Sequence, residues 1–375
     1  MNLSTKPARR TWRRIADSRV INALAAPNGI GRYLEVLNPM WSLDQTRIPA
    51  YITAIRRETK DTVTLELRPN GDWPGFRPGQ FCQLYIEING RLHSRSYSLK
   101  RRAGRISVTV KAQADGLVSR YINSQLKVGD IIRLSPPMGD FVLPELLPDA
   151  LLMIAAGSGI TPIMAMLEAA LKRGYKGGVT LLYYNRSEAD TVFHARLLKL
   201  ASTYSNFSLL PVFSDGTGKL NGHFSQQHLL TALSFQNNLS AHTGALTLPE
   251  CFVCGPEALI QAVSDEYQLL GHSEKFHAER FKAVTSTSGD TGAVGTLIFK
   301  NSQSEVSSDS RNLLEQAEAA GLQPQSGCRM GICHSCSCLK TDGSVRNMNS
   351  GEVSHGEEYI RLCISQPLGD VSLAI

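Results

Sequence analysis

Four cysteines near the C-terminus constrain this chain more than any other feature of its sequence. Cys328, Cys333 and Cys336 lie within nine residues of one another, and Cys363 follows after 26 intervening residues. This C-x4-C-x2-C…C spacing is typical of a [2Fe–2S] site, in which three thiolates converge from one tight loop and a fourth closes the cage. Glycines beside the first cysteine and inside the loop would let backbone N–H groups approach the sulfides. The sequence therefore predicts that these four cysteines hold a [2Fe–2S] cluster.

Two other roles for the cysteines are a zinc site and a disulfide loop. Zinc knuckles come as paired C-x2-C units, whereas the C-terminal region contains one such pair. Five of the eight cysteines cluster between residues 328 and 363, which favours metal ligation over disulfides. Cys338 is a further candidate ligand two residues after Cys336, but the spacing favours Cys336.

Length and composition indicate a globular protein of two or three domains, because a domain averages about 150 residues. The chain has 375 residues, of which 42% are hydrophobic and 19% charged. The sequence contains no run of about 18 uncharged apolar residues, so it predicts no transmembrane helix. A basic start followed by a short apolar stretch at 20–27 resembles a signal peptide only loosely. We expect a protein of the reducing cytoplasm, with membrane association through its partner.

Charge is unevenly distributed along the chain. Residues 290–375 carry six Lys or Arg and ten Asp or Glu, a net charge of −4 within a total of +6, so the rest carries +10. An acidic unit beside a basic remainder suits short electron-transfer encounters, although a solvated surface without a partner explains the charge equally well. The sequence has no basic stripe with interleaved aromatic residues, so nucleic-acid binding is not predicted.

Changes of sequence pattern divide the chain into five segments. Alternating apolar and polar residues at 62–67, 81–86 and 105–110 predict an antiparallel β-barrel. Later a buried strand, a helix and another strand, at 151–156, 161–173 and 179–184, predict a parallel α/β unit. The expected segments are a basic, partly helical N-terminal extension at 1–46, a barrel at 47–147, an α/β domain at 148–283, a linker at 284–294 and a C-terminal unit at 295–375.

A glycine-rich turn follows the first strand of the α/β unit. Gly157, Ser158 and Gly159 would let a nucleotide pyrophosphate approach backbone donors, with Thr161 as helix N-cap and Pro162 at the first helical position. Further along, Cys254, Gly255 and Pro256 end the strand at 250–253 and precede a helix.

A second short motif lies in the β-rich part. Arg95, Ser96, Tyr97 and Ser98 end a strand, and Asp115 to Ser119 form a loop that enters a helix. Together with the order of the domains, these residues resemble the ferredoxin–NADP reductase superfamily, whose barrel binds flavin. The C-terminal unit, including the helix from Leu313 and the tail after Cys363, resembles a plant-type ferredoxin domain and implies a β-grasp fold.

The resemblance implies roles for particular residues. Arg95 would pair with the flavin phosphate through its planar guanidinium, Tyr97 would lie against the isoalloxazine ring, and Ser98 would hydrogen-bond near the flavin N5. Cys254 would lie beside the hydride path. The backbone around Gly116 would hold a pyrophosphate at a helix N-terminus, which favours FAD over FMN. The implied cofactor-binding set also includes Ser96, Lys111, Leu117, Val118, Ser119, Gly255 and Pro256. From their position near the end of the α/β domain alone, Glu279 or Phe281 is expected to border the flavin.

The nucleotide is expected to be NADPH, with NADH as the alternative. An acidic residue after the second strand would favour the 2′-OH of NADH, whereas Arg186 and Ser187 stand there and could meet a 2′-phosphate.

The order of domains predicts an electron circuit from NAD(P)H through FAD to the cluster. A hydride carries two electrons, a cluster accepts one, and a flavin bridges the two. The segment from Leu37 to Ser42 is similar to reductase partners of membrane-bound fatty-acyl desaturases, which implies such an acceptor. The basic extension could touch anionic lipid or pack on the barrel as a helix. The alternatives are the reductase of an aromatic-ring dioxygenase or a P450, and a redox-sensing iron–sulfur flavoprotein.

Overall fold

The computed structural model describes residues 11, 13–18, 21, 23, 29–102, 105–239, 248–281, 295–327, 329–331 and 334–375. The expected linker at 284–294 lies outside these residues. The chain forms two compact units, Met1–Glu279 and Arg280–Ile375. No helix in the described part of the chain is long and apolar enough to cross a membrane.

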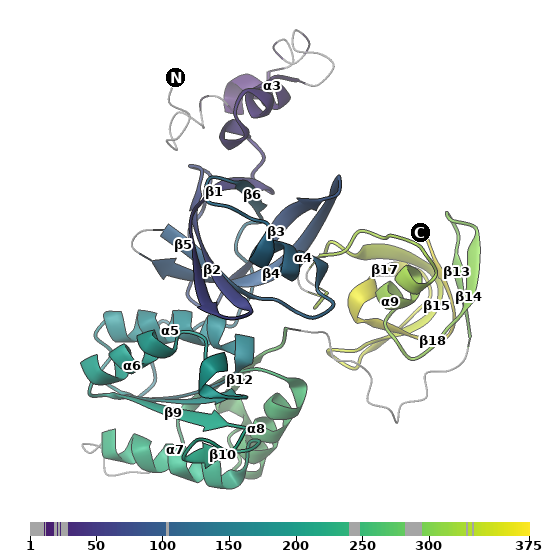
Figure 1. Cartoon of the computed structure of the whole chain (residues 1–375). Helices are drawn as coiled ribbons and strands as arrows, with labels where there is room; N and C mark the ends of the chain where they lie inside the picture. Colours follow the sequence, from purple (N-terminus) through teal and green to yellow (C-terminus); the bar gives the residue numbers. More distant parts are fainter. Residues whose placement is uncertain are drawn as a thin grey trace. The chain divides into compact units, whose positions relative to one another are not determined.

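A closed antiparallel barrel forms the first half of unit one, which confirms the prediction (Figure 1). Its strand order is β1-β2-β5-β4-β3-β6. Alternate side chains of β2, including Val63 and Leu65, point into the barrel core, as the period-two pattern requires. The elements are β1 Ile48–Thr59, β2 Thr62–Pro69, β3 Phe81–Ile88, β4 Arg91–Arg102, β5 Arg105–Lys111, α4 Leu117–Ser124 and β6 Ile131–Leu134, preceded by α3 Gly29–Leu37 and η1 Pro39–Trp41.

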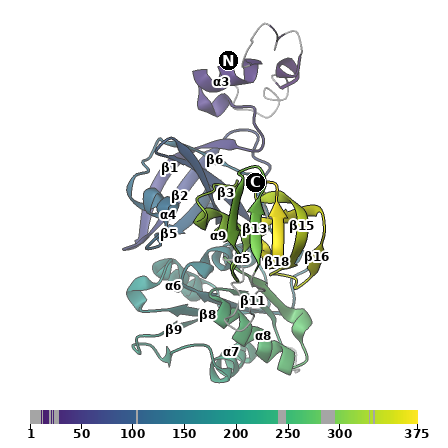
Figure 2. The ribbon, with the colours of Figure 1, turned by 90° about the vertical axis from the view of Figure 1, so that its right-hand side faces the viewer.

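A parallel six-stranded sheet forms the second half of unit one, in the order β10-β9-β8-β7-β11-β12. Its elements are β7 Ala150–Ala156, η2 Gly157–Gly159, α5 Ile160–Lys172, β8 Gly178–Asn185, η3 Glu188–Asp190, α6 His194–Thr203, β9 Phe207–Phe213, β10 Leu220–Asn221, α7 Gln226–Leu239, β11 Glu250–Cys254, α8 Glu257–Leu269, η4 Ser273–Lys275 and β12 Phe276–Glu279. Helices α5 and α6 cover one face, and α7 and α8 cover the other (Figure 2). The strand order reverses between β7 and β11, and ligands of such sheets bind at the carboxyl ends of the strands beside this point.

Unit two is a mixed sheet packed against one helix, as expected for a β-grasp fold. The strand order is β14-β13-β18-β15-β16, with β17 paired to β15. Leu313, Leu314 and Ala317 of the helix share a core with Leu297 and Phe299 of the sheet. The elements are β13 Thr296–Phe299, β14 Ser304–Ser307, α9 Leu313–Ala319, β15 Ser337–Asn347, β16 Val353–His355, β17 Glu358–Arg361, η5 Leu362–Ile364 and β18 Ser365–Leu373.

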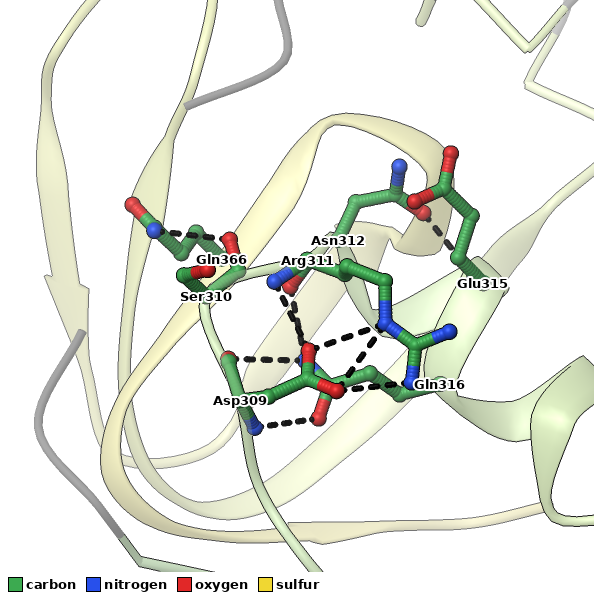
Figure 3. Close-up of polar contacts among 7 residues, drawn as sticks. All are labelled: Asp309, Ser310, Arg311, Asn312, Glu315, Gln316 and Gln366. Atoms are coloured by element: carbon green, nitrogen blue, oxygen red, sulfur yellow. Dashed lines mark hydrogen bonds and ion pairs between the residues drawn. The ribbon is translucent and has the colours of Figure 1, made fainter. Parts of the chain in front are cut away.

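Polar side chains fasten the loop before α9 to the rest of unit two (Figure 3). The Asn312 side chain caps the helix by accepting from the Glu315 N–H (3.0 Å). Gln316 accepts from the Asp309 N–H (2.8 Å) and donates to the Arg311 carbonyl (2.6 Å). Gln366, at the start of β18, donates to the Ser310 carbonyl (2.9 Å). The loop is thereby tied to the strand that follows Cys363.

Candidate functional site

The predicted flavin residues of β4 line up along one strand of the barrel. Ser98 is buried, and its hydroxyl accepts a hydrogen bond from Thr161 of α5 (3.2 Å). Tyr97 packs against the barrel core, and burial raises the pKa of its phenol, so the ring stays neutral. The guanidinium of Arg95 donates to the carbonyl of Ser94 (2.8 Å). The Ser96 hydroxyl is buried and has no hydrogen-bond partner within the described residues.

The second predicted flavin segment begins at the N-terminus of α4, where Gly116 is the N-cap residue. A Cβ at Gly116 would lie 2.3 Å from the Ser119 Oγ and 2.9 Å from the Gln113 Cβ, so any larger residue would displace these neighbours. Val118 is buried in the barrel core, whereas Leu117 is 51% exposed. Lys111, at the end of β5, forms an ion pair with Asp61 (3.6 Å). The first turn of α4 has no side-chain cap, and together with the Ser96 hydroxyl, which has no partner within the described residues, it fits a bound flavin phosphate.

The predicted nucleotide residues meet at the switch point of the parallel sheet. Ala155 of β7 pairs with Cys254 of β11, so the turn Gly157–Gly159 and the segment from Cys254 to Pro256 lie side by side. A Cβ at Gly159 would come within 2.0 Å of the Cys254 carbonyl oxygen, so this close approach requires glycine. A Cβ at Gly255 would lie 3.1 Å from the Ala156 Cβ, a closer contact than most side chains make.

The expected cap of α5 is wrong. The helix begins at Ile160 and its N-cap is Gly159, so Thr161 and Pro162 lie second and third in the helix. The 3-10 turn Gly157–Gly159 runs directly into α5, so the helix starts earlier in the sequence than predicted. The Thr161 hydroxyl, freed from capping, shares its single proton between the Ser158 carbonyl (3.0 Å) and the Ser98 hydroxyl (3.2 Å). Thr161 thus connects the nucleotide side of the site to the flavin side.

A buried carboxyl group lies beside Cys254. Glu279 of β12 pairs with Cys254 in the sheet register, and its Oε2 has no hydrogen-bond partner in the described part of the chain. Burial raises the pKa of Glu279 to about 8. Burial, and then the Glu279 charge, raise the pKa of the Cys254 thiol. Cys254 is therefore a neutral thiol, consistent with a positioning role and not with nucleophilic attack. Phe281 belongs to unit two and is 40% exposed.

The predicted choice of nucleotide depends on the end of β8. Arg186 lines a cavity of about 360 Å³ together with Gly157. The Ser187 hydroxyl instead donates to Asp190 (3.0 Å). Lys111, from the predicted flavin set, also lines this cavity. Sequence reasoning missed Lys60, Asp61 and His223, because the β1–β2 turn and the segment after β10 are far from Arg186 in sequence, and it also passed over Asp190, four residues after Arg186.

Two of the four predicted cluster ligands lie in the described part of unit two. The Cys336 and Cys363 sulfurs are 3.2 Å apart, too far for a disulfide and close enough to converge on one group. The Leu362 N–H donates to the Cys336 carbonyl (3.1 Å), which joins the two segments. Cys328 and Cys333 lie outside the described residues, and within those residues no group of three or more ligating side chains is found. The thiol pair fits half of a four-cysteine cluster site.

Side-chain contacts hold the described residues of the cluster loop, Arg329, Met330 and Gly331. Arg329 forms a two-pronged ion pair with Glu318 of α9, with Nη1 2.9 Å from Oε2. The Met330 carbonyl accepts from the Asn349 side chain (3.2 Å), and the Gly331 carbonyl accepts from Arg361. Gly331 has φ +77°, and a Cβ there would clash with Ile364 at 2.5 Å. This loop conformation therefore requires glycine.

Comparison with known families matches all three parts of the chain. Residues 49–143 match the oxidoreductase FAD-binding domain, residues 153–265 the oxidoreductase NAD-binding domain, and residues 298–368 the 2Fe-2S iron-sulfur cluster binding domain. An NADPH oxidoreductase of Mycobacterium tuberculosis is 34% identical over 351 residues, covering 92% of this chain and 88% of that protein. This chain belongs to the ferredoxin–NADP reductase family with a C-terminal [2Fe–2S] ferredoxin domain.

Further relatives share this arrangement of domains. The ferredoxin reductase component of 3-ketosteroid-9-alpha-monooxygenase from Mycobacterium tuberculosis is 33% identical, covering 79% of this chain and 84% of that protein. The solved structure of phthalate dioxygenase reductase has the same fold, with a TM-score of 0.59 at 22% identity, covering 88% of this chain and 98% of that chain. The reductase described here is an electron-transfer oxidoreductase that uses NAD(P)H, FAD and a [2Fe–2S] cluster.

Proposed function

We propose that this reductase delivers single electrons from its cluster to a separate oxygen-activating iron enzyme. The observation that carries the proposal is the presence of the nucleotide, flavin and cluster domains in one chain. A hydride donor and a one-electron carrier in one chain suit an acceptor that consumes electrons singly. The monooxygenase reductase relative supports an oxygenase as this acceptor.

Removal of one cluster ligand tests where single electrons leave the chain. Cys336→Ser should abolish NADPH-dependent reduction of cytochrome c, a one-electron protein acceptor, and leave ferricyanide reduction by the flavin within about twofold, because the two sites lie in separate units. Cys338→Ser is the matched control and should retain both activities. Equal cytochrome c reduction by Cys336→Ser and the natural protein would contradict the proposal.

A membrane fatty-acyl desaturase is the narrower candidate acceptor, supported by an exposed apolar face on α3. Tyr33, Val36 and Leu37 stand at i, i+3 and i+4 and are 52%, 69% and 72% exposed. Leu34 is buried and Glu35 pairs with Arg133 of the barrel, so contacts with the barrel hold the opposite part of the helix. Basic residues precede this helix in the sequence. An apolar face with basic flanks suits an anionic membrane surface.

Flotation with vesicles tests this contact. The natural chain should float with vesicles that contain an anionic phospholipid, and Val36→Ser/Leu37→Ser should float several-fold less while reducing ferricyanide at the normal rate. Leu92→Ser, at another exposed leucine, is the control. Equal flotation of the double variant and the natural chain would remove the support that α3 gives to a membrane-bound acceptor.

A further inference from the structure

The cavity at the end of β8 is lined from both halves of unit one. The nucleotide domain contributes Arg186, Asp190 and His223, and the β1–β2 turn of the barrel contributes Lys60 and Asp61. An ion pair between the Lys60 Nζ and the Asp190 Oδ1 (3.8 Å) crosses from one half to the other. The lining of this cavity thus depends on both domains.

The position of the cavity identifies which part of a dinucleotide it would receive. The pyrophosphate belongs at the glycine turn after β7, and the adenosine ribose lies at the end of the next strand. That strand is β8, which ends at Asn185, directly before Arg186. Positively charged side chains line this position from three segments of the chain, Lys60 after β1, Lys111 at the end of β5 and Arg186 after β8, and His223 lies beside them after β10.

Each carboxylate of the lining lies within ion-pair distance of a lysine, at 3.8 Å for Asp190 and 3.6 Å for Asp61. Lys60 pairs with Asp190, which also accepts from the Ser187 hydroxyl, and Lys111 pairs with Asp61. A free carboxylate at this place would accept from a ribose 2′-OH and repel a 2′-phosphate. Because a lysine lies within ion-pair distance of each carboxylate, the positive charge of Arg186 is left to attract an anion.

A buried donor gives independent support for a ligand. The Asn185 side chain is 9% exposed and lines the cavity, and its Nδ2 makes no hydrogen bond within the described residues, although it lies near the Tyr183 hydroxyl. Buried amide donors are nearly always satisfied in folded proteins. A ligand oxygen in the cavity would supply the acceptor.

We propose that this cavity binds the 2′-phosphate of NADPH and that Lys60, carried by the flavin-binding barrel, determines specificity together with Arg186 and His223. This proposal rests on the NAD(P)H-dependent activity and concerns only the donor. Lys60 has two effects: it adds positive charge beside the phosphate, and it keeps the Asp190 carboxylate paired. Loss of Lys60 would therefore remove an attraction and add a repulsion.

Binding of nucleotide fragments to the flavin-loaded protein tests the proposal. Lys60→Met should weaken binding of adenosine 2′,5′-bisphosphate about tenfold or more, as expected for one charge-assisted phosphate contact, and change binding of 5′-AMP less than twofold. Lys176→Met is the matched control, since Lys176 is exposed and precedes the opposite end of β8. It should change neither affinity. Equal weakening of both fragments by Lys60→Met, or no weakening, would overturn the proposal.

A second variant separates the two effects of Lys60. In Lys60→Met/Asp190→Asn the freed carboxylate is gone, so affinity for the 2′,5′-bisphosphate should recover part of the loss. In turnover, Lys60→Met should lower the ratio of kcat/KM for NADPH to that for NADH about tenfold or more, whichever acceptor is used. An unchanged ratio would overturn the donor assignment, and it would leave the proposed acceptor untouched because ferricyanide suffices for this assay.

Discussion

One hydrogen bond joins the flavin side and the nucleotide side of this reductase. Thr161 of α5 donates to Ser98 of β4, and both side chains are buried. Because Gly159 contacts the Cys254 carbonyl, the first turn of α5 places Ser98 and Cys254 on two sides of one short segment. A donor nucleotide and a flavin can meet productively only if such groups keep their relative positions.

Thr161→Val tests this connection, because valine has the shape of threonine without its hydroxyl. We expect normal flavin content, a loss of about 1 kcal/mol in stability, and flavin reduction by NADPH about tenfold slower. Stopped-flow absorbance would measure the rate. Thr161→Ser, which keeps the hydroxyl, should reduce the flavin near the normal rate, and equally slow reduction by both variants would assign the effect to packing.

Glu279 makes the stability of unit one depend on pH. Its folded pKa of about 8 lies above the ordinary 4.5, because burial disfavours the carboxylate. Between these pKa values the folded chain keeps a proton that the unfolded chain has released, so the contribution of Glu279 to stability falls as pH rises.

We therefore expect Glu279→Gln to gain in unfolding temperature relative to the natural protein as pH rises from 5 to 8. The comparison uses the difference between the two proteins at each pH, so that other titrating groups cancel. Thermal unfolding followed by circular dichroism supplies the measurement. A difference that stays constant from pH 5 to pH 8 would show that Glu279 is ionised in the folded protein.

Among the elements, α9 supports the cluster loop through an ion pair at the C-terminal end of the helix. Glu318 of α9 pairs with Arg329 in the loop, and the N-terminal end of the helix is fixed by Gln316 (Figure 3). Gln316 is 3% exposed and makes three hydrogen bonds to the backbone of Asp309 and Arg311. Weakening this end of α9 should therefore affect the cluster through Arg329.

Gln316→Ala removes these hydrogen bonds and leaves partly buried backbone groups of Asp309 and Arg311 without their side-chain partner. We expect a loss of about 2–4 kcal/mol and a lower temperature of cluster loss, by about 10 °C or more, measured as bleaching of the cluster absorbance on heating. Gln325→Ala, at an exposed position of the same unit, should have no measurable effect. Equal bleaching temperatures for Gln316→Ala and Gln325→Ala would show that the hydrogen bonds of Gln316 do not stabilise the cluster.

Elements with local signals were predictable from the sequence, and contacts across the fold were not. The alternation of apolar residues such as Val63 and Leu65 with polar ones predicted the barrel strands. The spacing of Cys336 to the neighbouring cysteines predicted the cluster. Thr161 looked like an N-cap because its role depends on Ser98, more than sixty residues earlier. Lys60 gave no signal at all, since its place beside Asp190 exists only when the barrel and the α/β domain fold together.

At the scale of the whole molecule, two features separate the hydride chemistry from the delivery of single electrons. Flavin and nucleotide belong to unit one, and the cluster belongs to unit two. The acidic balance of residues 290–375 gives the electron-delivering unit a charge opposite to that of the rest of the chain. Reduction of a basic protein such as cytochrome c should consequently slow as salt is raised, because the attraction between opposite charges is screened.

An anaerobic titration with NADPH tests the central claim, the circuit from NAD(P)H through FAD to the cluster in one chain. The flavin and cluster absorbance should both bleach, and the cluster should give the electron paramagnetic resonance signal of a reduced [2Fe–2S] centre at a rate independent of protein concentration. In Cys336→Ser the flavin alone should bleach. A natural protein whose flavin is fully reduced while its cluster stays oxidised, or whose cluster reduction speeds up with protein concentration, would contradict the account.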